Sequence, residues 1–389
     1  MAISDNAGAE ASRGEELRFD PARVRRVLIY RLGSLGDTMV ALPSLHVVER
    51  AFPNARRVML TNLPVHAKAP MASAVLEGSG LVHGYIDYPV GTRNPAELAR
   101  VWLKIRRFRP EAMVYLAPPR GEAAIARDLR FFRMCGIRNV VGVPLGDLAE
   151  SHFYEGSGLW EPEAQRLLRS VRLLGEADVE DRRWWDLRLT DAELKKADSL
   201  LAAMGDTPLI ACGPGTKVQA KDWGQENWRL LLGRISAAFP DHALVLVGAR
   251  EDAATSEYAA GDWRGRALNL CGELSPRETA AVLRHTELFL GPDSGPMHLA
   301  GAVGVPCAIA FSARGPAGKW YPAGDRHRIV YHAVDCRWCS LDVCIEQGRK
   351  CLTSISVDEM FAAAVEAWKN GRSGPTSSPA GQSGQPCTS

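Results

Sequence analysis

A glycine-containing loop between a short apolar strand and an amphipathic helix constrains the fold of this chain more than any other feature. Residues 27–30 (VLIY) have strand-forming side chains, and the loop that follows, residues 31–37 (RLGSLGD), contains two glycines. A helical pattern then extends to Phe52-Pro53, and residues 58–61 (VMLT) form the next strand. Strand, loop, helix and strand in this order predict a βαβ unit, and therefore a parallel sheet.

Similar alternations continue on both sides of a charged stretch at residues 175–189, which we interpret as an interdomain connection. Two α/β halves in tandem are the simplest interpretation, with ligands bound at the carboxyl ends of the strands, between the halves. Residues 306–311 are expected to close the second sheet. The other predicted strands are residues 84–87, 112–116, 140–143, 209–212, 243–247 and 287–291. The other predicted helices are residues 96–108, 163–174, 228–238, 253–260 and a segment through Ala302.

Length and composition agree with two domains of ordinary size. The chain has 389 residues, of which 46% are hydrophobic and 24% are charged, enough for a substantial core. We predict a disordered tail at residues 1–20, Rossmann-like domains at 21–185 and 186–370, and a disordered tail at 371–389, where Gly, Ser, Pro and Gln dominate.

Charge and apolar content also limit the classes of function. Lys and Arg number 47 and Asp and Glu number 45, which argues against a dedicated nucleic-acid binder and favours a small-molecule ligand. The polar N-terminus has no signal-peptide pattern, and no apolar run reaches the roughly 18 residues of a membrane span. We therefore expect a cytoplasmic protein whose nine cysteines meet a reducing environment.

Three loops that follow predicted strands contain residue types suited to chemistry. In residues 291–300 (GPDSGPMHLA), Asp293, Ser294 and Gly295 end a strand and open a helix, whose free N–H groups attract anions such as a diphosphate. The competing interpretation, an ordinary helix cap, is favoured by turn chemistry alone.

The second loop, residues 213–217 (GPGTK), combines two glycines with Lys217, and Lys221 lies just beyond it. Glycines allow a phosphate to approach the backbone and a lysine supplies a positive charge, although a solvated lysine is an equally good interpretation. Glu251 and Asp252 follow the strand at 243–247, where a carboxylate could accept ribose hydroxyls or, more simply, begin a helix.

The third loop is the first along the chain, and it holds Asp37 between Gly36 and Thr38. A carboxylate at the carboxyl end of a strand is well placed to accept a proton from a hydroxyl, and capping its own helix is the competing role. Dinucleotide binding is a weak alternative, because the G-x-G-x-x-G pattern is incomplete and the second strand ends in Thr61-Asn62 rather than an acid.

Together, these segments resemble glycosyltransferase family 9, the bacterial ADP-heptose:lipopolysaccharide heptosyltransferases. The resemblance runs in order through residues 25–368, and the segment at residues 292–300 is the most specific. The residues that carry it are 31–37 with 42–45 (LPSL), 213–215 with Lys221-Asp222-Trp223 and Trp228, and 292–300 with Gly304-Val305-Pro306.

The resemblance implies a GT-B fold, in which two Rossmann-like α/β/α domains face a central cleft, and inverting transfer of a heptose from ADP-heptose. It implies that Asp37 is the general base and that Lys221 contacts the leaving diphosphate. Domain 21–185 would bind the acceptor through Ser34, Gly36 and Arg120. Domain 186–370 would bind the nucleotide sugar, through Gly215, Thr216, Lys217, Glu251, Asp293, Ser294, Gly295, Pro296 and His298.

Such a reaction requires one base and charge neutralisation at the leaving group, so neither a cofactor nor a metal is expected, and there is no Asp-x-Asp motif. The implied partners are a nucleotide sugar and a glycolipid or glycan acceptor, at the inner face of the cytoplasmic membrane, and no nucleic acid. Residues 117–133 carry four arginines that could face a phosphorylated glycolipid, although a solvated helix face is the simpler interpretation.

Departures from the family pattern leave alternatives open. Residues 311–316 (FSARGP) lack the family's usual Gly-Pro-Thr-Asp-Pro, so the chain could use another nucleotide sugar for O-antigen, surface polysaccharide or secondary-metabolite synthesis. A GT-B protein that binds or isomerises a sugar nucleotide without transferring it is a further alternative. Family members resemble this chain in having cysteines near residues 336–351, and we favour a structural or simple thiol role over a metal site. The cysteines are Cys336, Cys339, Cys344 and Cys351.

Overall fold

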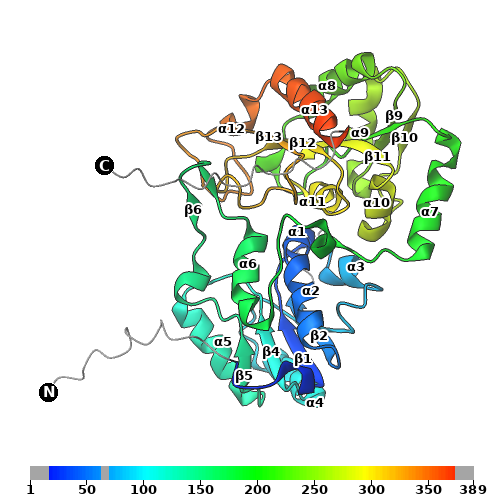
Figure 1. Ribbon diagram of the computed structural model, residues 1–389. Coiled ribbons are helices and arrows are strands. Elements are labelled where there is room, and N and C mark those ends of the chain that lie inside the picture. The colour runs from blue at the N-terminus through cyan, green and yellow to red at the C-terminus, as the bar shows by residue number, and fades with distance from the viewer. Residues whose placement is uncertain (1–16, 63–69, 373–389) are drawn as a thin grey trace, which may run out of the picture.

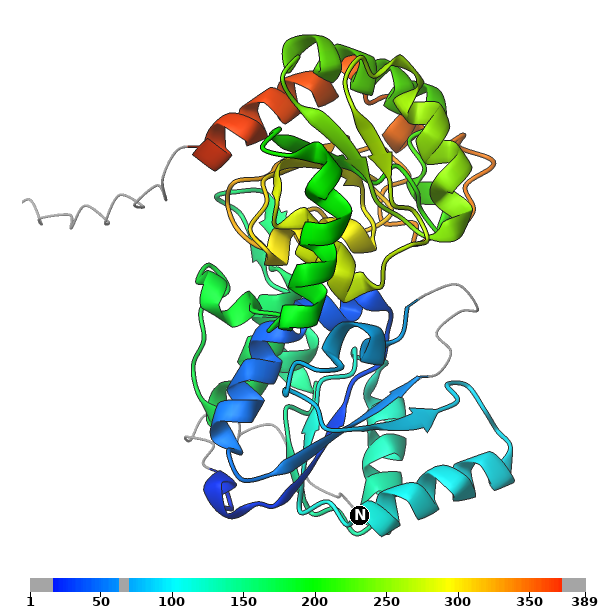
Figure 2. The same ribbon diagram turned by 90° about the vertical axis from the view of Figure 1, so that its right-hand side faces the viewer.

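The computed structural model describes residues 17–62 and 70–372, and it contains two parallel sheets in tandem. Figures 1 and 2 show the two α/β halves stacked one above the other, with the N-terminal half below. Helices cover both faces of each sheet, because the strands have apolar side chains on both faces and both faces must be shielded from water. Two Rossmann-like halves are therefore confirmed.

The N-terminal sheet has five parallel strands in the order β3-β2-β1-β4-β5. The central strand β1 begins the chain's first βαβ unit, and Val27, Leu28 and Ile29 are completely buried in it. The strands are β1 (Arg26–Tyr30), β2 (Arg56–Asn62), β3 (Tyr85–Tyr88), β4 (Ala112–Tyr115) and β5 (Asn139–Val141). The helices are α1 (Leu35–Val40), α2 (Leu42–Ala51), α3 (Ala72–Leu76), α4 (Pro95–Phe108), α5 (Glu122–Met134) and α6 (Glu163–Val171).

The C-terminal sheet has six parallel strands in the order β10-β9-β8-β11-β12-β13. Its strands are β8 (Leu209–Cys212), β9 (Ala243–Leu246), β10 (Ala267–Asn269), β11 (Thr286–Pro292), β12 (Cys307–Phe311) and β13 (Arg328–Tyr331). Its helices are α7 (Asp191–Leu201), α8 (Gln225–Ala238), α9 (Ala253–Ala259), α10 (Pro276–Leu283), α11 (Gly295–Ala302), α12 (Lys350–Thr353) and α13 (Val357–Arg372). None of the described helices is long and apolar enough to cross a bilayer.

Several sequence-based boundaries were wrong. Residues 306–311 do not close the second sheet, because β13 pairs beyond β12, and its half-buried side chains gave no clear strand pattern. The first helix is two helices that meet at Ala41, where Pro43 occupies the first turn of α2. Residues 17–20 are ordered, since Phe19 stacks on Phe52. The predicted disordered segments at 1–16 and 373–389 lie outside the described residues.

The stretch at 175–189 is packed rather than a free connection. It contains the short helix η4 (Arg182–Trp185), whose Trp185 is buried and whose Trp184 lies under Arg50 of α2. Arg182 donates a hydrogen bond to the Val303 carbonyl at 2.7 Å, in the other half of the molecule. Residues 175–189 therefore contact both halves of the molecule and link them by this hydrogen bond.

A histidine between β12 and β13 should make the fold sensitive to acid. His327 accepts a hydrogen bond from the Cys307 N–H through Nδ1 and donates one to the Ala323 carbonyl through Nε2, so the ring must be neutral. Burial lowers the pKa of His327 from 6.5 to about 4, although the bond to Ala323 raises it. The unfolded chain therefore takes up this proton first as the pH falls, and stability is lost below about pH 6.5.

The free energy of unfolding should thus fall between about pH 7 and about pH 5, by on the order of 2 kcal/mol from this group. Urea unfolding of the wild type and of His327→Gln measures that contribution. Glutamine can keep both hydrogen bonds but has no proton to bind, so the variant should lose less stability over the same range. Equal losses in the two proteins would show that His327 does not titrate as described.

Candidate active site

Asp37 lies at the carboxyl end of β1, folded back over the start of its own helix. Its Oδ2 accepts hydrogen bonds from the Ser34 N–H at 2.8 Å and the Ser34 hydroxyl at 3.0 Å. Gly33 has a φ of 131°, and a Cβ there would lie 2.2 Å from Asp37 Cγ, so only glycine fits beneath the carboxylate. Asp37 thus does cap helix α1, while its side chain stays 28% exposed.

The sequence analysis missed the residue that holds this loop. The Arg31 side chain is almost completely buried and donates to the Asp37 carbonyl through Nε at 3.0 Å and to the Leu116 carbonyl through Nη1 at 2.7 Å. Its Nη2 lies 3.7 Å from Asp37 Oδ1. Burial lowers the pKa of Arg31, and Asp37 opposes that shift. An arginine directly after a buried strand was the available signal, because a buried charge needs partners.

In the C-terminal half, Lys221 and Asp293 form an ion pair at the carboxyl ends of β8 and β11. Lys221 Nζ lies 2.8 Å from Asp293 Oδ2, and the side chains are 19% and 9% exposed. The sequence analysis assigned both residues to the leaving diphosphate, and the structure brings them together. Each partner keeps the other's charge from being buried alone.

His298 lies where the two halves meet. A Cβ added to Gly36 would lie 3.1 Å from His298 Cδ2, so a side chain on Gly36 would press on the ring. Burial lowers the pKa of His298 to about 4; nearby Asp293 and Asp37 raise it and Lys221 lowers it. The imidazole is therefore neutral at neutral pH, and it lies within the electrostatic reach of both halves of the predicted site.

The loop at the start of α11, which was predicted to hold the diphosphate, contains Gly295 and Pro296. Gly295 has no positive φ, and a Cβ there would lie 3.2 Å from Leu35 Cδ2 in α1. Gly295 therefore leaves room for Leu35 in this conformation, rather than for a diphosphate. Pro296 occupies the first turn of α11, where a missing N–H costs no hydrogen bond.

Two serine hydroxyls at neighbouring strand ends have no hydrogen-bond partner among the described residues. They belong to Ser294, after β11, and Ser312, after β12, and both Oγ atoms are buried. Each lies two residues beyond Pro292 and Ala310, the last residues that pair between β11 and β12. Buried hydroxyls without partners are costly, so this edge of the sheet suits a ligand rich in hydrogen-bond acceptors.

Gly215, Thr216, Lys217 and Glu251 lie farther out along the same edge. Lys217 Nζ pairs with Glu251 Oε1 at 2.5 Å, and both side chains are more than one third exposed. The Thr216 hydroxyl accepts from the Val218 N–H at 3.3 Å and shapes the turn. A Cβ on Gly215 would lie 2.3 Å from Asp252 Cγ, so Asp252, the second of the two acids noted after β9, is the carboxylate that packs in this loop.

Arg120, assigned to the acceptor, is already engaged within the N-terminal half. Its Nη2 donates to the Tyr30 hydroxyl at 2.8 Å and pairs closely with Asp128, which also accepts from Tyr115 at 2.8 Å. Arg120 lines a cavity of about 640 Å³ between α4 and α5. The other polar and aromatic side chains of that cavity are Tyr30, Tyr88, Thr92, Arg93, Arg127, Asp128, Phe131 and Phe132.

The four clustered cysteines follow β13. Cys344 is buried, Cys336 and Cys351 are half-buried, and Cys339 is exposed; none forms a disulfide. Within residues 17–62 and 70–372, no three His, Cys, Asp or Glu side chains are grouped so that they could hold a metal ion. Trp338, inside this cluster, stacks edge-on against Trp160 of the other half, with ring centroids 5.7 Å apart.

Comparison with known proteins places this geometry in context. Residues 148–349 match the family model described as glycosyltransferase family 9 (heptosyltransferase). No curated protein matches the chain in sequence. Solved structures with the same fold include a family 9 glycosyl transferase from Veillonella parvula, with a TM-score of 0.68 and 17% identity over 91% of this chain and 99% of that one.

Two E. coli structures are also similar. ADP-heptose lipopolysaccharide heptosyltransferase II has a TM-score of 0.60 and 14% identity, covering 90% of this chain and 100% of that one. The iron-containing dodecameric glycosyltransferase TibC has a TM-score of 0.50 and 14% identity, covering 90% of this chain and 77% of that one. At these identities the likeness establishes the fold, and the predicted GT-B arrangement is confirmed.

Proposed function

This chain belongs to glycosyltransferase family 9, and from that membership we propose that it is an inverting heptosyltransferase that transfers a heptose from ADP-heptose to a lipopolysaccharide core sugar or a related glycan. One observation carries the proposal. Gly36, next to Asp37, lies against His298 where the halves meet, and Asp37 and the Lys221–Asp293 pair of the other half all act electrostatically on that histidine. A base and a leaving-group site on opposite sides of one point suit an inverting transfer.

In the proposed reaction, Asp37 accepts the proton of the acceptor hydroxyl through its carboxylate. The acceptor oxygen bonds to the anomeric carbon from the face opposite the diphosphate, and the bond from that carbon to the diphosphate oxygen breaks. Lys221 and the free N–H groups of α11 stabilise the charge that develops on the departing ADP. The fixed loop formed by Arg31 and Gly33 supports this role, because it positions the carboxylate before substrate binds.

On the donor side we assign the diphosphate to Lys221, Asp293, Ser294 and the start of α11. The unpartnered hydroxyls of Ser294 and Ser312 support this assignment, since both can donate to phosphate oxygens. We assign the nucleoside and the sugar next to it to the outer loop, which is the loop after β8 together with Glu251. The residues of the outer loop are Gly215, Thr216, Lys217 and Glu251. Pro296 and His298 of α11 bind the donor at the other end of the site, near the diphosphate.

On the acceptor side we propose Ser34 and Gly36 beside the base, and the cavity lined by Arg120 for the rest of the acceptor. Arg93 and Arg127 are exposed at that cavity and are available to bind phosphate groups. Arg120 instead pairs with Asp128, which neutralises its charge, and it holds the cavity wall in place. We propose that the enzyme works in the cytoplasm, on a lipid-linked acceptor at the inner face of the membrane.

A donor screen tests the proposal. Thermal shift and product mass spectrometry with ADP-heptose, ADP-hexoses, GDP-hexoses and UDP-hexoses should show the largest stabilisation and transfer with ADP-heptose. The unusual sequence at 311–316, which contains Ser312, favours one alternative, a different nucleotide sugar for another surface glycan. Preference for a GDP- or UDP-sugar would establish that alternative, and binding without any transfer would favour a non-transferring sugar-nucleotide protein.

Transfer should persist after exhaustive EDTA treatment. The physical reason is that Lys221 and the α11 N-terminus supply the positive charge that a divalent ion supplies in other transferases. Initial rates before and after chelation, with and without added Mg²⁺ or Mn²⁺, measure this, and metal analysis of the treated protein provides the control. Activity that returns only with added metal would contradict metal independence.

A further inference from the structure

A basic surface with exposed apolar side chains covers one outer layer of the N-terminal half. Residues 95–109, which are α4 and the residue after it, include five basic residues and one acid, Glu97 in the first turn. On the solvent side of α4, Leu103 is 57% exposed and lies among Arg100, Arg106 and Arg107, which are all exposed. We call this face, together with the part of α5 described next, the α4–α5 surface.

Helix α5 continues the same layer. Residues 122–138 contain four arginines and two acids: Glu122 at the exposed start of α5, and Asp128, which is buried and paired with Arg120. Met134 is 65% exposed at the end of α5, and its carbonyl accepts a hydrogen bond from the Trp102 indole of α4 at 3.1 Å. The two helices lie on the same side of the sheet, because Val101 and Ile105 of α4 and Phe132 of α5 share one apolar cluster.

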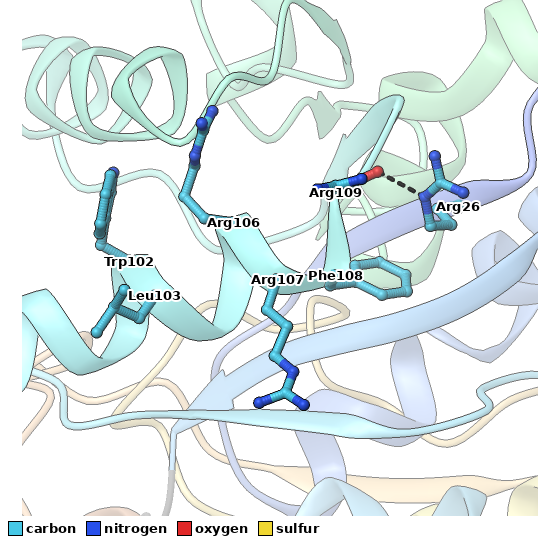
Figure 3. A pocket seen from close by; sticks show the side chains of 7 residues that line it. All are labelled: Arg26, Trp102, Leu103, Arg106, Arg107, Phe108 and Arg109. Atoms are coloured by element: carbon cyan, nitrogen blue, oxygen red, sulfur yellow. Dashed lines mark hydrogen bonds between the residues drawn. The ribbon is translucent and has the colours of Figure 1, made fainter.

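A shallow hollow of about 520 Å³ lies at the C-terminal end of α4. Figure 3 shows Arg106 and Arg107 leaving the helix in opposite directions, with Arg26 and Arg109 beyond its end. Arg26 is held by the Arg109 carbonyl at 2.7 Å and by Glu111, whereas Arg106 and Arg107 have no salt bridge among the described residues. Trp102, Leu103 and Phe108 complete the wall of the hollow.

The mixture of basic and apolar side chains favours an anionic lipid surface over a nucleic acid as the partner. The chain as a whole carries a formal charge of only +2, so the basic residues of this layer are a local concentration. A surface that binds nucleic acid through its phosphates needs only basic side chains. Here Leu103, Met134 and the Trp102 indole add apolar surface between the basic residues. Arginine around exposed apolar and aromatic groups on a helix is the pattern of a surface that rests in a lipid headgroup layer.

We propose that the α4–α5 surface docks on an anionic lipid bilayer, with the hollow at Arg106 and Arg107 receiving a phospholipid headgroup. Figures 1 and 2 place α4 at the end of the molecule farthest from the C-terminal half, so that half remains clear of the membrane. The cavity proposed for the acceptor is lined by Leu98 of α4 and Arg127 of α5, and so borders the docked surface. The inference deepens the proposed function, because a lipid-linked acceptor would then reach that cavity along the membrane.

Vesicle co-sedimentation of the full chain tests the docking. The wild type should bind vesicles of phosphatidylethanolamine and phosphatidylglycerol and should not bind vesicles of phosphatidylcholine alone. A double variant, Arg106→Gln with Arg107→Gln, should bind the anionic vesicles about 20- to 30-fold more weakly, since each arginine near an anionic surface contributes roughly a fivefold effect. The matched control is Arg264→Gln with Arg284→Gln, two exposed arginines of the other half that form no salt bridge among the described residues.

Leu103→Ser should also weaken binding to anionic vesicles, and more clearly at high salt, where the electrostatic contribution is screened. Equal binding by the wild type and the Arg106/Arg107 variant, or RNA binding without vesicle binding, would overturn the proposal. Transfer to a lipid-free acceptor separates this failure from that of the proposed function. The double variant should transfer at the wild-type rate in that assay, whereas no transfer by the wild type would count against the enzyme activity itself.

Discussion

Asp37→Asn should lower turnover by about 10²–10⁴-fold, the usual cost of losing a general base, while leaving nucleotide-sugar binding almost unchanged. Asparagine has the shape of aspartate and can still accept the Ser34 N–H hydrogen bond, so helix α1 should keep its cap. It cannot accept the proton of the acceptor hydroxyl. Single-turnover kinetics with saturating donor, together with ADP calorimetry, separate the two effects.

Asp87→Asn is the matched control for this substitution. Asp87 also lies near the end of a strand, β3, of the N-terminal sheet, but its side chain is about half exposed, and its one ion pair among the described residues is with Lys104 at 3.4 Å. Near-normal turnover is expected for this variant. If Asp37→Asn also turned over near the wild-type rate, Asp37 would be only a helix cap and the base would have to be found elsewhere.

Lys221→Met should lower kcat/KM for the donor by about 10²–10³-fold, the typical effect of removing one group that stabilises developing charge. The variant also leaves Asp293 without its partner at 2.8 Å, in a site where Asp293 is 9% exposed. Some loss of stability is therefore expected as well. Thermal unfolding measured in parallel shows the temperature range in which the variant is folded, and kinetics are compared there.

The control is Lys217→Met, because the motif left open which lysine contacts the diphosphate. Lys217 forms an exposed ion pair with Glu251, and such pairs contribute about 0–1 kcal/mol, so less than a tenfold effect is expected. A larger loss for Lys217→Met than for Lys221→Met would reverse the assignment. It would place the diphosphate along the outer loop rather than between the halves.

The βαβ alternation was enough to predict two parallel sheets, because apolar strand runs and the loops between them are local signals. Strand β13 was missed because its side chains are only half-buried and Arg328 begins it. Helices α7, α10 and α13 were not identified as helices. Their boundaries depend on caps and on packing against residues far along the chain, as between α7 and α10, where Arg277 pairs with Glu193.

The candidate site shows a similar division. Loops that follow strands identified Asp37, Lys221, Asp293 and His298, because strand ends in parallel sheets meet at one edge. The partners of these residues could not be predicted. Arg31, which reaches the Leu116 carbonyl, and Leu35, which lies against Gly295, act across contacts that no spacing in the sequence encodes.

The contact between Leu35 and Gly295 has a consequence for how tightly a donor can bind. With α1 resting on α11, both Asp293 and His298 are buried where the halves meet, so the donor assignment proposed above requires α1 and α11 to separate at that point. On that assignment the protein exchanges between a closed and an open population, and the observed dissociation constant is the intrinsic one divided by the open fraction. Every interaction that holds the empty halves together is thus subtracted from the affinity for the nucleotide sugar, and the same interactions become available again once ADP has left.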